Sequence, residues 1–253
     1  MTDRFSLRGR NAIITGGTRG IGLAIAQGFL EAGAKVTICS RKQYNVDEAL
    51  TELAEFSDSI QGVAAHVGKT EDLERLISHA ETRFGPVGIL VNNAGTNPYF
   101  GPLIKSEEAA WDKTMQVNLK GPYMLSKLVA KKMVAGNGGS IINIASVAGQ
   151  TALAMQGIYS ITKAGVIMLT KVMAKELGAQ NVRVNCICPG VVRTKLSEAL
   201  WADPKMEKQM ASLKALGRVG NTDELTGAAV YLASDAGSFT TGATLNVDGG
   251  MVI

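Results

Sequence analysis

The stretch TGGTRGIG, residues 15–22, decides how this chain is expected to fold. A short apolar run at 11–16 leads into it, and a helical pattern from about 20 to 32 follows it. Gly16, Gly20 and Gly22 let the backbone turn tightly and approach a ligand, because glycine has no Cβ. The amino end of the helix then offers free N–H groups and a positive dipole end, which suit a phosphate. An ordinary strand–helix turn has similar glycines, so the motif gains its weight from its surroundings.

Those surroundings are an alternation of apolar strands and helices along the whole chain. Such a pattern indicates a mostly parallel sheet that is covered on both faces. The helix that follows the third strand is expected to open with Thr70 as its N-cap, and residues 191–220 show mixed patterns. Strands are predicted at 11–16, 34–40, 60–67, 87–93, 138–146, 181–189 and 243–248, and helices at 20–32, 45–56, 71–84, 107–134, 157–177 and 222–233.

Composition limits the classes of protein that this chain can represent. Its 253 residues suit one α/β domain, and 46% apolar residues can fill a large core. The net charge of +4 comes from scattered basic residues, which argues against a nucleic-acid surface. The polar amino terminus lacks the apolar segment of a signal peptide, and no stretch is typical of a membrane span. Three cysteines favour a reducing compartment, with Cys186 and Cys188 more typical of buried thiols than of a metal site.

The end of the second predicted strand bears on which phosphate compound would bind. The glycine spacing is G-x-x-x-G-x-G, and it follows the first strand, where doubly wound sheets bind a dinucleotide. An acidic residue about 20 residues further on is typical of NAD sites. Here the strand ends CSRK at 39–42, with no acid before Asp47. Arg41, assisted by Arg19, would instead pair with a 2′-phosphate, which favours NADP(H), unless Arg41 and Lys42 are ordinary exposed residues.

Seven motifs in order then resemble the short-chain dehydrogenase/reductase family over nearly the whole chain. They are TGGTRGIG at 15–22, NNAG at 92–95, Asn118 in VNLKG, Ser146 in IASVAG, Tyr159 and Lys163 in YSITK, PGVVRT at 189–194 and VDGG at 247–250. The resemblance implies a doubly wound, Rossmann-type three-layer α/β sandwich with a seven-stranded parallel sheet. Because no linker is evident, the chain is expected to be a single dinucleotide-binding domain over 1–253. Its segment at about 191–215 carries Leu196, Leu200, Trp201 and Met206, which predict an apolar substrate lid unless they pack on the core or on a neighbouring subunit.

The resemblance assigns catalytic roles to four residues. Tyr159 would be the acid/base, and Lys163 would bind the nicotinamide ribose and lower the pKa of the tyrosine. Ser146 would hydrogen-bond the substrate oxygen, and Asn118 would hold a water in a proton relay. Physical chemistry agrees, because a free phenol has a pKa of about 10 and a nearby ammonium favours phenolate. Asn118 has a plainer alternative, namely a hydrogen bond to the backbone inside a helix.

The resemblance also implies a set of cofactor contacts. One departure from the family pattern is His66, which stands where many relatives place an Asp that meets adenine; a purely structural role for His66 is the alternative. The expected cofactor-binding residues are Gly16, Thr18, Arg19, Gly20, Ile21, Gly22, Ser40, Arg41, Lys42, His66, Val67, Asn93, Ala94, Gly95, Tyr159, Lys163, Pro189, Gly190, Val192 and Thr194.

The substrate is less closely defined by the sequence. HVGKTEDLERL, NPYFGPL and ALWADP resemble NADPH-dependent carbonyl reductases of the family, which favours a ketone or aldehyde, or the matching secondary alcohol, as substrate. The alternatives are a 3-oxoacyl-thioester reductase acting on an acyl-carrier protein and a non-catalytic NADPH-binding sensor. Family resemblance suggests a homotetramer with interfaces on helices 107–134 and 157–177. The carboxyl-terminal DGGMVI lacks a Ser-Lys-Leu address, so we expect a cytoplasmic protein without metal, membrane or nucleic-acid partners.

Overall fold

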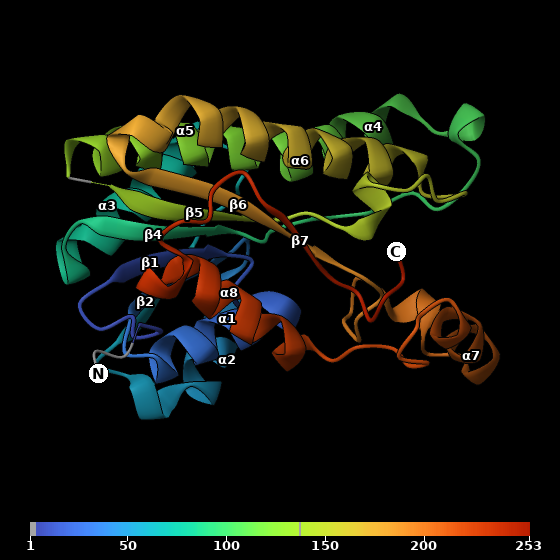
Figure 1. Ribbon diagram of the computed structural model, residues 1–253, viewed down its shortest axis with the longest axis horizontal. Helices are drawn as coiled ribbons and strands as arrows, with labels where there is room; N and C mark the ends of the chain where they lie inside the picture. The colour runs from blue at the N-terminus through green and yellow to red at the C-terminus, as the bar shows by residue number, and fades with distance from the viewer. Residues whose placement is uncertain (1–3, 137) are drawn as a thin grey trace.

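A seven-stranded sheet forms the centre of the protein, whose computed structural model describes residues 4–136 and 138–253. Every strand pairing is parallel, in the order β3-β2-β1-β4-β5-β6-β7 (Figure 1). The strands are β1 (Asn11–Thr15), β2 (Lys35–Ser40), β3 (Ile60–Ala64), β4 (Val87–Asn92), β5 (Gly139–Ile144), β6 (Val182–Pro189) and β7 (Thr244–Val247).

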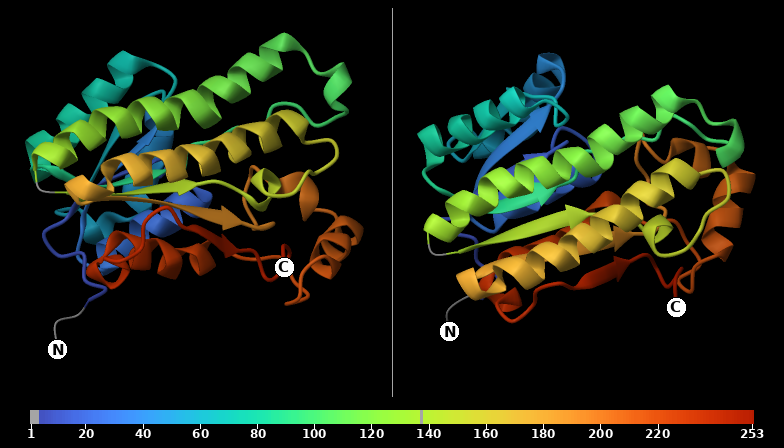
Figure 2. Two further views of the ribbon diagram at one scale, coloured as in Figure 1. Left: turned by 45° about the horizontal axis from the view of Figure 1, so that its top comes forward. Right: turned by 90° about the horizontal axis from the view of Figure 1, so that it is seen from above.

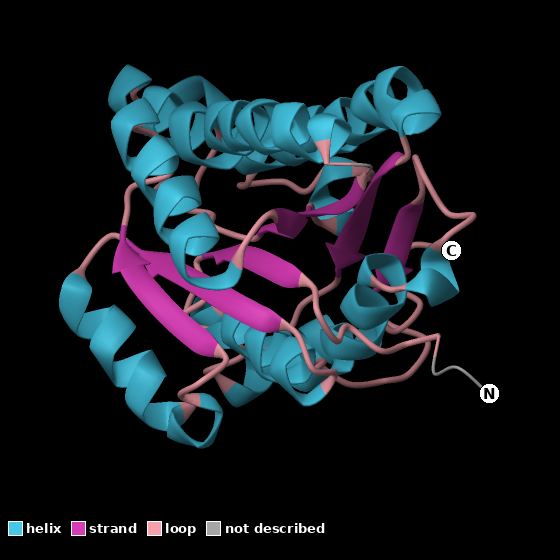
Figure 3. Cartoon of the chain, turned by 90° about the vertical axis from the view of Figure 1, so that its left-hand side faces the viewer, coloured by secondary structure: helices cyan, strands magenta, loops and turns pink. Residues whose placement is uncertain are grey.

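Helices cover both faces of this sheet, and Figure 3 shows the twisted sheet between the two helical layers. In Figure 1 one layer contains α1, α2 and α8, and the other contains α3, α5 and α6. This arrangement confirms the predicted doubly wound, three-layer α/β fold. The helices are α1 (Gly20–Glu31), α2 (Gln43–Glu52), α3 (Thr70–Phe84), α4 (Glu108–Met115), α5 (Gly121–Ala135), α6 (Gly157–Leu177), α7 (Pro204–Ser212) and α8 (Thr226–Ala233).

The strands are apolar throughout because both of their faces are buried. In β1, Ala12 and Ile14 pack into the core beneath α1 and α8, whereas Ile13 packs into the core beneath α3 and α5. All three side chains are fully buried. Side chains of successive strand residues point to opposite faces, so one short apolar run supplies both cores.

Two local predictions need correction, and a third region gains detail. Thr70 is the first residue of α3 and Lys69 is its N-cap, because the chain remains extended only as far as Lys69. The single helix expected at 107–134 is interrupted by a π-helical segment, Gln116–Lys120, between α4 and α5. The mixed region 191–220 contains α7, whose N-cap Asp203 accepts hydrogen bonds from two backbone N–H groups.

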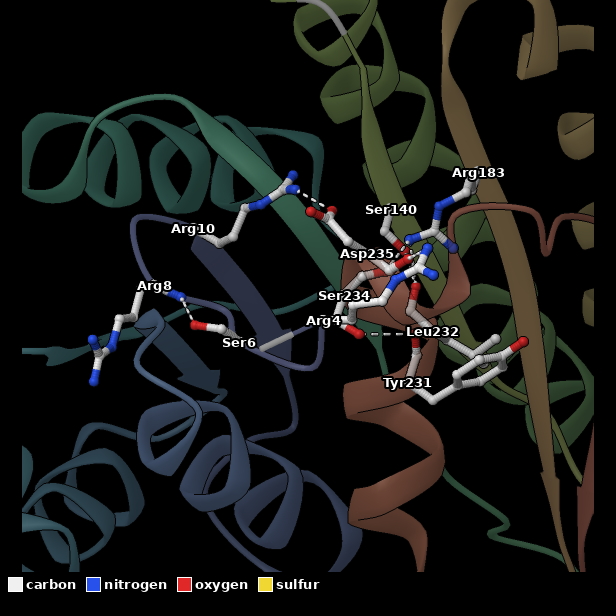
Figure 4. A network of polar contacts seen from close by, with 10 residues as sticks. All are labelled: Arg4, Ser6, Arg8, Arg10, Ser140, Arg183, Tyr231, Leu232, Ser234 and Asp235. Atoms are coloured by element: carbon white, nitrogen blue, oxygen red, sulfur yellow. Dashed lines mark hydrogen bonds and ion pairs between the residues drawn. The ribbon is translucent and has the colours of Figure 1, made fainter. Parts of the chain in front are cut away.

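A polar network joins the starts of several strands to the segment at the end of α8 (Figure 4). Arg183 in β6 donates to the carbonyl of Leu232 at 2.7 Å, and the hydroxyl of Ser140 in β5 donates to the same oxygen at 2.8 Å. Arg10, just before β1, pairs with Asp235 at 2.9 Å. The end of α8 is thereby held to three strands at the edge opposite to their carboxyl ends.

The strand order places a ligand site at the other edge. The chain winds one way from β1 to β3 and the other way from β4 to β7, so β1 and β4 flank the switch point. Doubly wound sheets bind ligands outside the carboxyl ends of the strands at this point. Figure 2 shows the strands pointing toward α7 and the loops around it. Among the described residues, no helix is both long and apolar enough to cross a membrane.

Candidate active site

The glycine turn after β1, residues 16–22, forms a cradle that is closely packed at its glycines. Gly16 and Gly20 have φ values of +62° and +57°, which favour glycine. A Cβ on Gly22 would lie 2.3 Å from the carbonyl oxygen of Gly16, so the helix packs directly on the turn. Arg19 is the N-cap of α1 and makes no side-chain cap hydrogen bond. The first N–H groups of α1 are therefore available to a bound anion.

The NNAG segment, which begins at the last residue of β4, supports this glycine turn through hydrogen bonds. The amide of Asn93 donates to the carbonyls of Thr15 and Gly16, at 3.0 Å each. In return, the hydroxyl of Thr15 accepts from the backbone N–H groups of Asn93 and Ala94, at 3.0 and 3.1 Å. The structure thus brings Asn93, Ala94 and the glycine turn together and fixes the turn's conformation.

The end of β2 carries the predicted phosphate-binding cations. Arg41 and Lys42 are exposed immediately after the strand, and Arg19 is exposed at the start of α1. Within residues 4–136 and 138–253, neither arginine takes part in an ion pair. Asp47 lies further along on α2, where it accepts a hydrogen bond from Gln43. The carboxyl end of β2 therefore carries a local positive charge.

His66 lies in the loop that follows β3, which ends at Ala64. Its Nδ1 accepts from the backbone N–H of Gly68 at 3.0 Å, which assigns the proton of the neutral ring to Nε2. Burial, followed by the positive charges of Lys113 and Arg41, lowers the pKa of His66. The ring is therefore a neutral donor close to Arg41, whereas an Asp at this position would be a charged acceptor. The second histidine, His79, is exposed on α3.

Tyr159 and Lys163 share one face of α6, one helical turn apart, as the sequence predicted. The ammonium of Lys163 lies 5.5 Å from the centre of the Tyr159 ring. Lys163 is only 4% exposed, and its Nζ donates to the carbonyl of Ile144, at the end of β5, at 2.7 Å. The hydrogen bond to the Ile144 carbonyl therefore holds the Lys163 ammonium near the Tyr159 ring.

Ser146 reaches the same place from the sheet. It follows β5, and its hydroxyl oxygen accepts from the backbone N–H of Ala148 at 3.1 Å. Its own proton remains available to the Tyr159 hydroxyl, and this hydrogen bond favours the phenolate. Ser146, Tyr159 and Lys163 thus form a cluster at the carboxyl edge of the sheet.

Asn118 lies in the π-helical segment and is 1% exposed. Its Oδ1 accepts from the N–H of Thr96 at 2.8 Å, and its Nδ2 donates to the carbonyl of Thr96 at 2.8 Å and to the hydroxyl of Thr162 at 3.2 Å. Both amide protons are therefore used to tie the loop after β4 to α6. A water relay through Asn118 stays a prediction. Because both amide protons are used, only the oxygen atoms of Asn118 are left to bind such a water.

Pro189 to Thr194 leave β6 beside the glycine turn. A Cβ on Gly190 would lie 2.9 Å from the Cα of Asp248, so this glycine permits close packing on the VDGG turn. Val192 is buried and forms an isolated bridge with Gly220. Thr194 faces Gly20, because a Cβ built on that glycine would lie 3.3 Å from the methyl carbon of Thr194. The predicted lid therefore starts within contact distance of the phosphate cradle.

Burial is the largest cause of the shifted pKa values of Tyr159 and Lys163. It raises the pKa of Tyr159 to about 12, an effect that the Ser146 hydrogen bond only partly offsets. Burial also lowers the pKa of Lys163 to about 8. At neutral pH Tyr159 is therefore a protonated phenol beside a charged lysine, which suits donation of a proton to a developing alkoxide.

A family model described as enoyl-(acyl carrier protein) reductase matches residues 16–252. Among curated proteins, dehydrogenase/reductase SDR family member 4 from Oryctolagus cuniculus is 41% identical over 250 residues, covering 99% of this chain and 96% of that protein. The human protein of that name is 39% identical, with coverage of 99% and 90%. The chain belongs to the short-chain dehydrogenase/reductase family.

Solved structures agree with this assignment to the short-chain dehydrogenases/reductases. A gluconate 5-dehydrogenase from Burkholderia cenocepacia, in complex with NADP and tartrate, is 39% identical with a TM-score of 0.92, covering 98% of this chain and 97% of its own. A short-chain type dehydrogenase/reductase from Mycobacterium ulcerans is 33% identical with a TM-score of 0.94, covering 97% and 90%. The protein is therefore an oxidoreductase of the CH-OH/C=O class, and its family uses a nicotinamide cofactor.

The residues of this short-chain dehydrogenase/reductase fit such a cofactor. The glycine cradle and the uncapped start of α1 suit a diphosphate, and the exposed cations after β2 suit a phosphorylated ribose. Within residues 4–136 and 138–253, no cluster of three or more metal-ligating side chains occurs. Cys39, Cys186 and Cys188 are free and fully buried, and burial raises the pKa of Cys39 to about 12.

Several supporting residues of the site were missed by the sequence analysis. Thr15 and Thr162 support the cradle and Asn118 through their hydroxyls. Asn143, in the core, accepts from Asn92 and donates to Thr170, at 2.8 Å each. The only signal for Asn92 and Asn143 was their polarity near the carboxyl ends of apolar strands, because a buried amide needs hydrogen-bond partners.

A pH profile tests the role of Lys163 in this short-chain dehydrogenase/reductase. We expect kcat/KM for carbonyl reduction to fall as the pH rises through about 8, because Lys163 then loses its charge while Tyr159 keeps its proton. This parameter reports ionisations of the free enzyme. In Lys163→Arg the alkaline fall should disappear, since arginine stays charged. A fall that persists unchanged in this variant would assign the ionisation to another group.

Proposed function

We propose that this protein is an NADP(H)-dependent oxidoreductase that interconverts ketones or aldehydes and alcohols, with secondary alcohols as the products from ketones. The observation that carries the proposal is the convergence of Ser146, Tyr159 and Lys163 at the carboxyl edge of the sheet, with Lys163 held by the Ile144 carbonyl at 2.7 Å. The glycine cradle lies at the same edge, so cofactor and substrate would meet there.

In this proposal the protein positions the substrate and moves one proton. When bound, the nicotinamide supplies or accepts the hydride. The Ser146 hydroxyl orients the carbonyl oxygen, and Tyr159 donates its proton to that oxygen as negative charge develops. Lys163 stabilises the resulting phenolate through its positive charge. In the direction of alcohol oxidation, the same phenolate accepts the hydroxyl proton.

A preference for NADP(H) is proposed on the basis of charge. Arg41 and Lys42 end β2, Arg19 starts α1, and the nearest acid along the chain after β2, Asp47, faces Gln43 on α2. A 2′-phosphate would meet guanidinium groups that have no competing carboxylate partner among the described residues. The related gluconate 5-dehydrogenase whose structure contains NADP is consistent with this preference.

The substrate class is proposed from the segments around the site. Phe100, Met155 and Leu196 expose 58%, 41% and 55% of their surfaces on loops beyond the strand ends. Leu200, Trp201 and Met206 of the predicted lid are half-buried. This apolar surface favours an uncharged ketone or aldehyde. A polyhydroxy acid is a second candidate, because one similar structure is a gluconate 5-dehydrogenase with bound tartrate.

Initial rates on a panel of substrates test the proposal. NADPH and NADH oxidation would be measured with ketones, aldehydes, diketones, 3-oxoacyl thioesters and 5-ketogluconate, and NADP⁺ reduction with gluconate. We expect the fastest turnover with NADPH and an apolar carbonyl compound. If the dominant activity is on 3-oxoacyl thioesters or on gluconate, the proposed substrate class is wrong, but the proposed hydride transfer stands. Tight cofactor binding with no turnover in either direction would favour a non-catalytic NADPH sensor.

A homotetramer is proposed from the outer surface of α4, α5 and α6; in Figure 2, α4 and α5 run end to end and α6 lies alongside them. A groove of about 660 Å³ opens there, lined by Met115, Leu119, Tyr123 and Leu169 among others. Met168 and Val172 of α6 are 58% and 44% exposed. Apolar surface of this kind is typical of subunit contacts.

Sedimentation velocity tests the tetramer. Met168→Glu should lower the sedimenting mass, because it places a charge in the apolar contact. Tyr44→Glu, on the opposite helical layer at α2, is the control and should leave the mass unchanged. A wild-type protein that sediments as a monomer would contradict the proposal. We further propose a cytoplasmic location, which the three free cysteines support.

A further inference from the structure

The first turn of the predicted lid is built around one hydroxyl group. Ser197 Oγ donates to the carbonyl of Val192 and accepts from the backbone N–H of Thr194 at 3.2 Å. The hydroxyl of Thr194 lies 3.0 Å from the same oxygen. Since Ser197 has one proton, and Val192 takes it, the Thr194 hydroxyl donates to Ser197. The turn is therefore closed by Ser197.

The indole N–H of Trp201 also holds this turn. Its Nε1 lies 3.2 Å from both the carbonyl of Thr194 and Ser197 Oγ, so the N–H is shared between them. The guanidinium of Arg193 lies 5.7 Å from the indole ring and pairs with Glu207 of α7. Through Arg193, Trp201 thus links the turn to α7, the helix of the lid.

The base of the turn is fixed to the rest of the protein. The N–H of Arg193 donates to the carbonyl of Gly220 at 2.9 Å, and the N–H of Gly220 donates to the carbonyl of Val191 at 3.1 Å. Thr194 is held between this base and the indole, with its methyl group facing Gly20 of the phosphate cradle. Its position relative to the cradle is therefore set before any ligand binds.

We propose that Trp201 is a positioning residue that holds Thr194 in place for the cofactor diphosphate. The inference rests on the proposed function, because it requires a dinucleotide in the cradle. When the diphosphate binds, the Thr194 hydroxyl turns its proton from Ser197 to a phosphate oxygen. Ser197 Oγ keeps the N–H groups of Trp201 and Thr194 as donors, so no buried acceptor loses all its partners. The lid is thus preorganised, which reduces the ordering cost of binding.

Calorimetric titration of Trp201→Phe tests this role. The variant keeps an aromatic ring beside Arg193 but lacks the N–H. We expect its Kd for NADPH to rise about three- to tenfold, the usual effect of losing one hydrogen bond. The Kd for adenosine 2′-monophosphate, which lacks the diphosphate, should not change. Trp111→Phe, at an exposed position on α4, is the matched control and should bind both compounds like the wild type.

Ser197→Ala provides a second variant that acts through the same turn. It should also weaken NADPH binding and leave adenosine 2′-monophosphate unaffected, and the double variant should be less than additive. Equal weakening of both compounds, or unchanged NADPH binding in both variants, would overturn the positioning role while leaving the proposed function intact. A wild-type protein that binds no dinucleotide would overturn the proposed function and this inference together.

Discussion

Replacing Tyr159 with Phe is expected to lower kcat for carbonyl reduction by about 10²–10⁴-fold, the usual contribution of a general acid. The variant loses only the hydroxyl that carries the proton and keeps the ring, which lies 5.5 Å from the Lys163 ammonium. Burial holds the pKa of the tyrosine at about 12, so the wild-type group is protonated at neutral pH and ready to donate. The measurement is kcat with saturating NADPH and the best carbonyl compound from the panel.

Cofactor binding separates this loss from a loss of folding. The Kd for NADPH should change by less than about threefold in Tyr159→Phe, because the loss of one hydroxyl contact is a small part of a dinucleotide's affinity. Tyr123→Phe, on the outer surface of α5, removes an equivalent hydroxyl and should keep full turnover. If Tyr159→Phe retains wild-type kcat, the proton comes from another group and the mechanism is wrong.

Arg41→Asp is expected to lower the preference for NADPH over NADH by about 100-fold or more. A hydrogen bond to a charged group contributes about 1.5–3 kcal/mol, and the carboxylate would add repulsion of the 2′-phosphate. NADH lacks that phosphate, and its ribose hydroxyls would gain the acidic partner that is typical of NAD sites. The measurement is the ratio of kcat/KM for the two cofactors.

The matched control for this charge reversal is Arg8→Asp, which makes the same change at an exposed position before β1. It should leave the cofactor ratio unchanged if the effect is local rather than one of net charge. Measurements at low and high salt add a second criterion, because the Arg41 contribution should weaken as salt screens it. A wild-type enzyme that prefers NADH would refute the assignment of Arg41 before any variant is made.

The sequence predicted the sheet well because its signals are local. Each parallel strand is buried on both faces, so runs such as Asn11–Thr15 stand out as apolar segments between helices. Gly22 was also readable from the sequence as part of the glycine turn. Only glycine fits there, because a Cβ would lie 2.3 Å from the backbone oxygen of Gly16. Tyr159 and Lys163 stand four residues apart in the predicted helix 157–177, so the sequence could place both on one helical face. The roles expected for the pair came from the family resemblance, not from this spacing.

The supporting contacts of the site were beyond prediction because they join segments distant in sequence. The carbonyl of Ile144 that aims Lys163 is a backbone atom with no residue-specific signature. The π-helical segment at Gln116–Lys120 resembles ordinary helix in sequence, and only its hydrogen bonds distinguish it. The hydrogen bonds between the Asn118 amide and Thr96 depend on the loop after β4 meeting the π-helical segment, 22 residues further along the chain.

The network around Arg183 and Asp235 has a consequence for engineering this protein. Substitutions that stabilise an enzyme often reduce its activity when they stiffen residues near the chemistry. Here the contacts drawn in Figure 4 hold the end of α8 and Asp235 to the starts of β1, β5 and β6. Tyr159 lies in the first turn of α6, beyond the carboxyl ends of the strands. These contacts and the proposed catalytic residues therefore lie at opposite ends of the same strands. Heat-resistant variants selected around Arg10 and Ser140 should keep their catalytic rate, and the two properties can be improved independently.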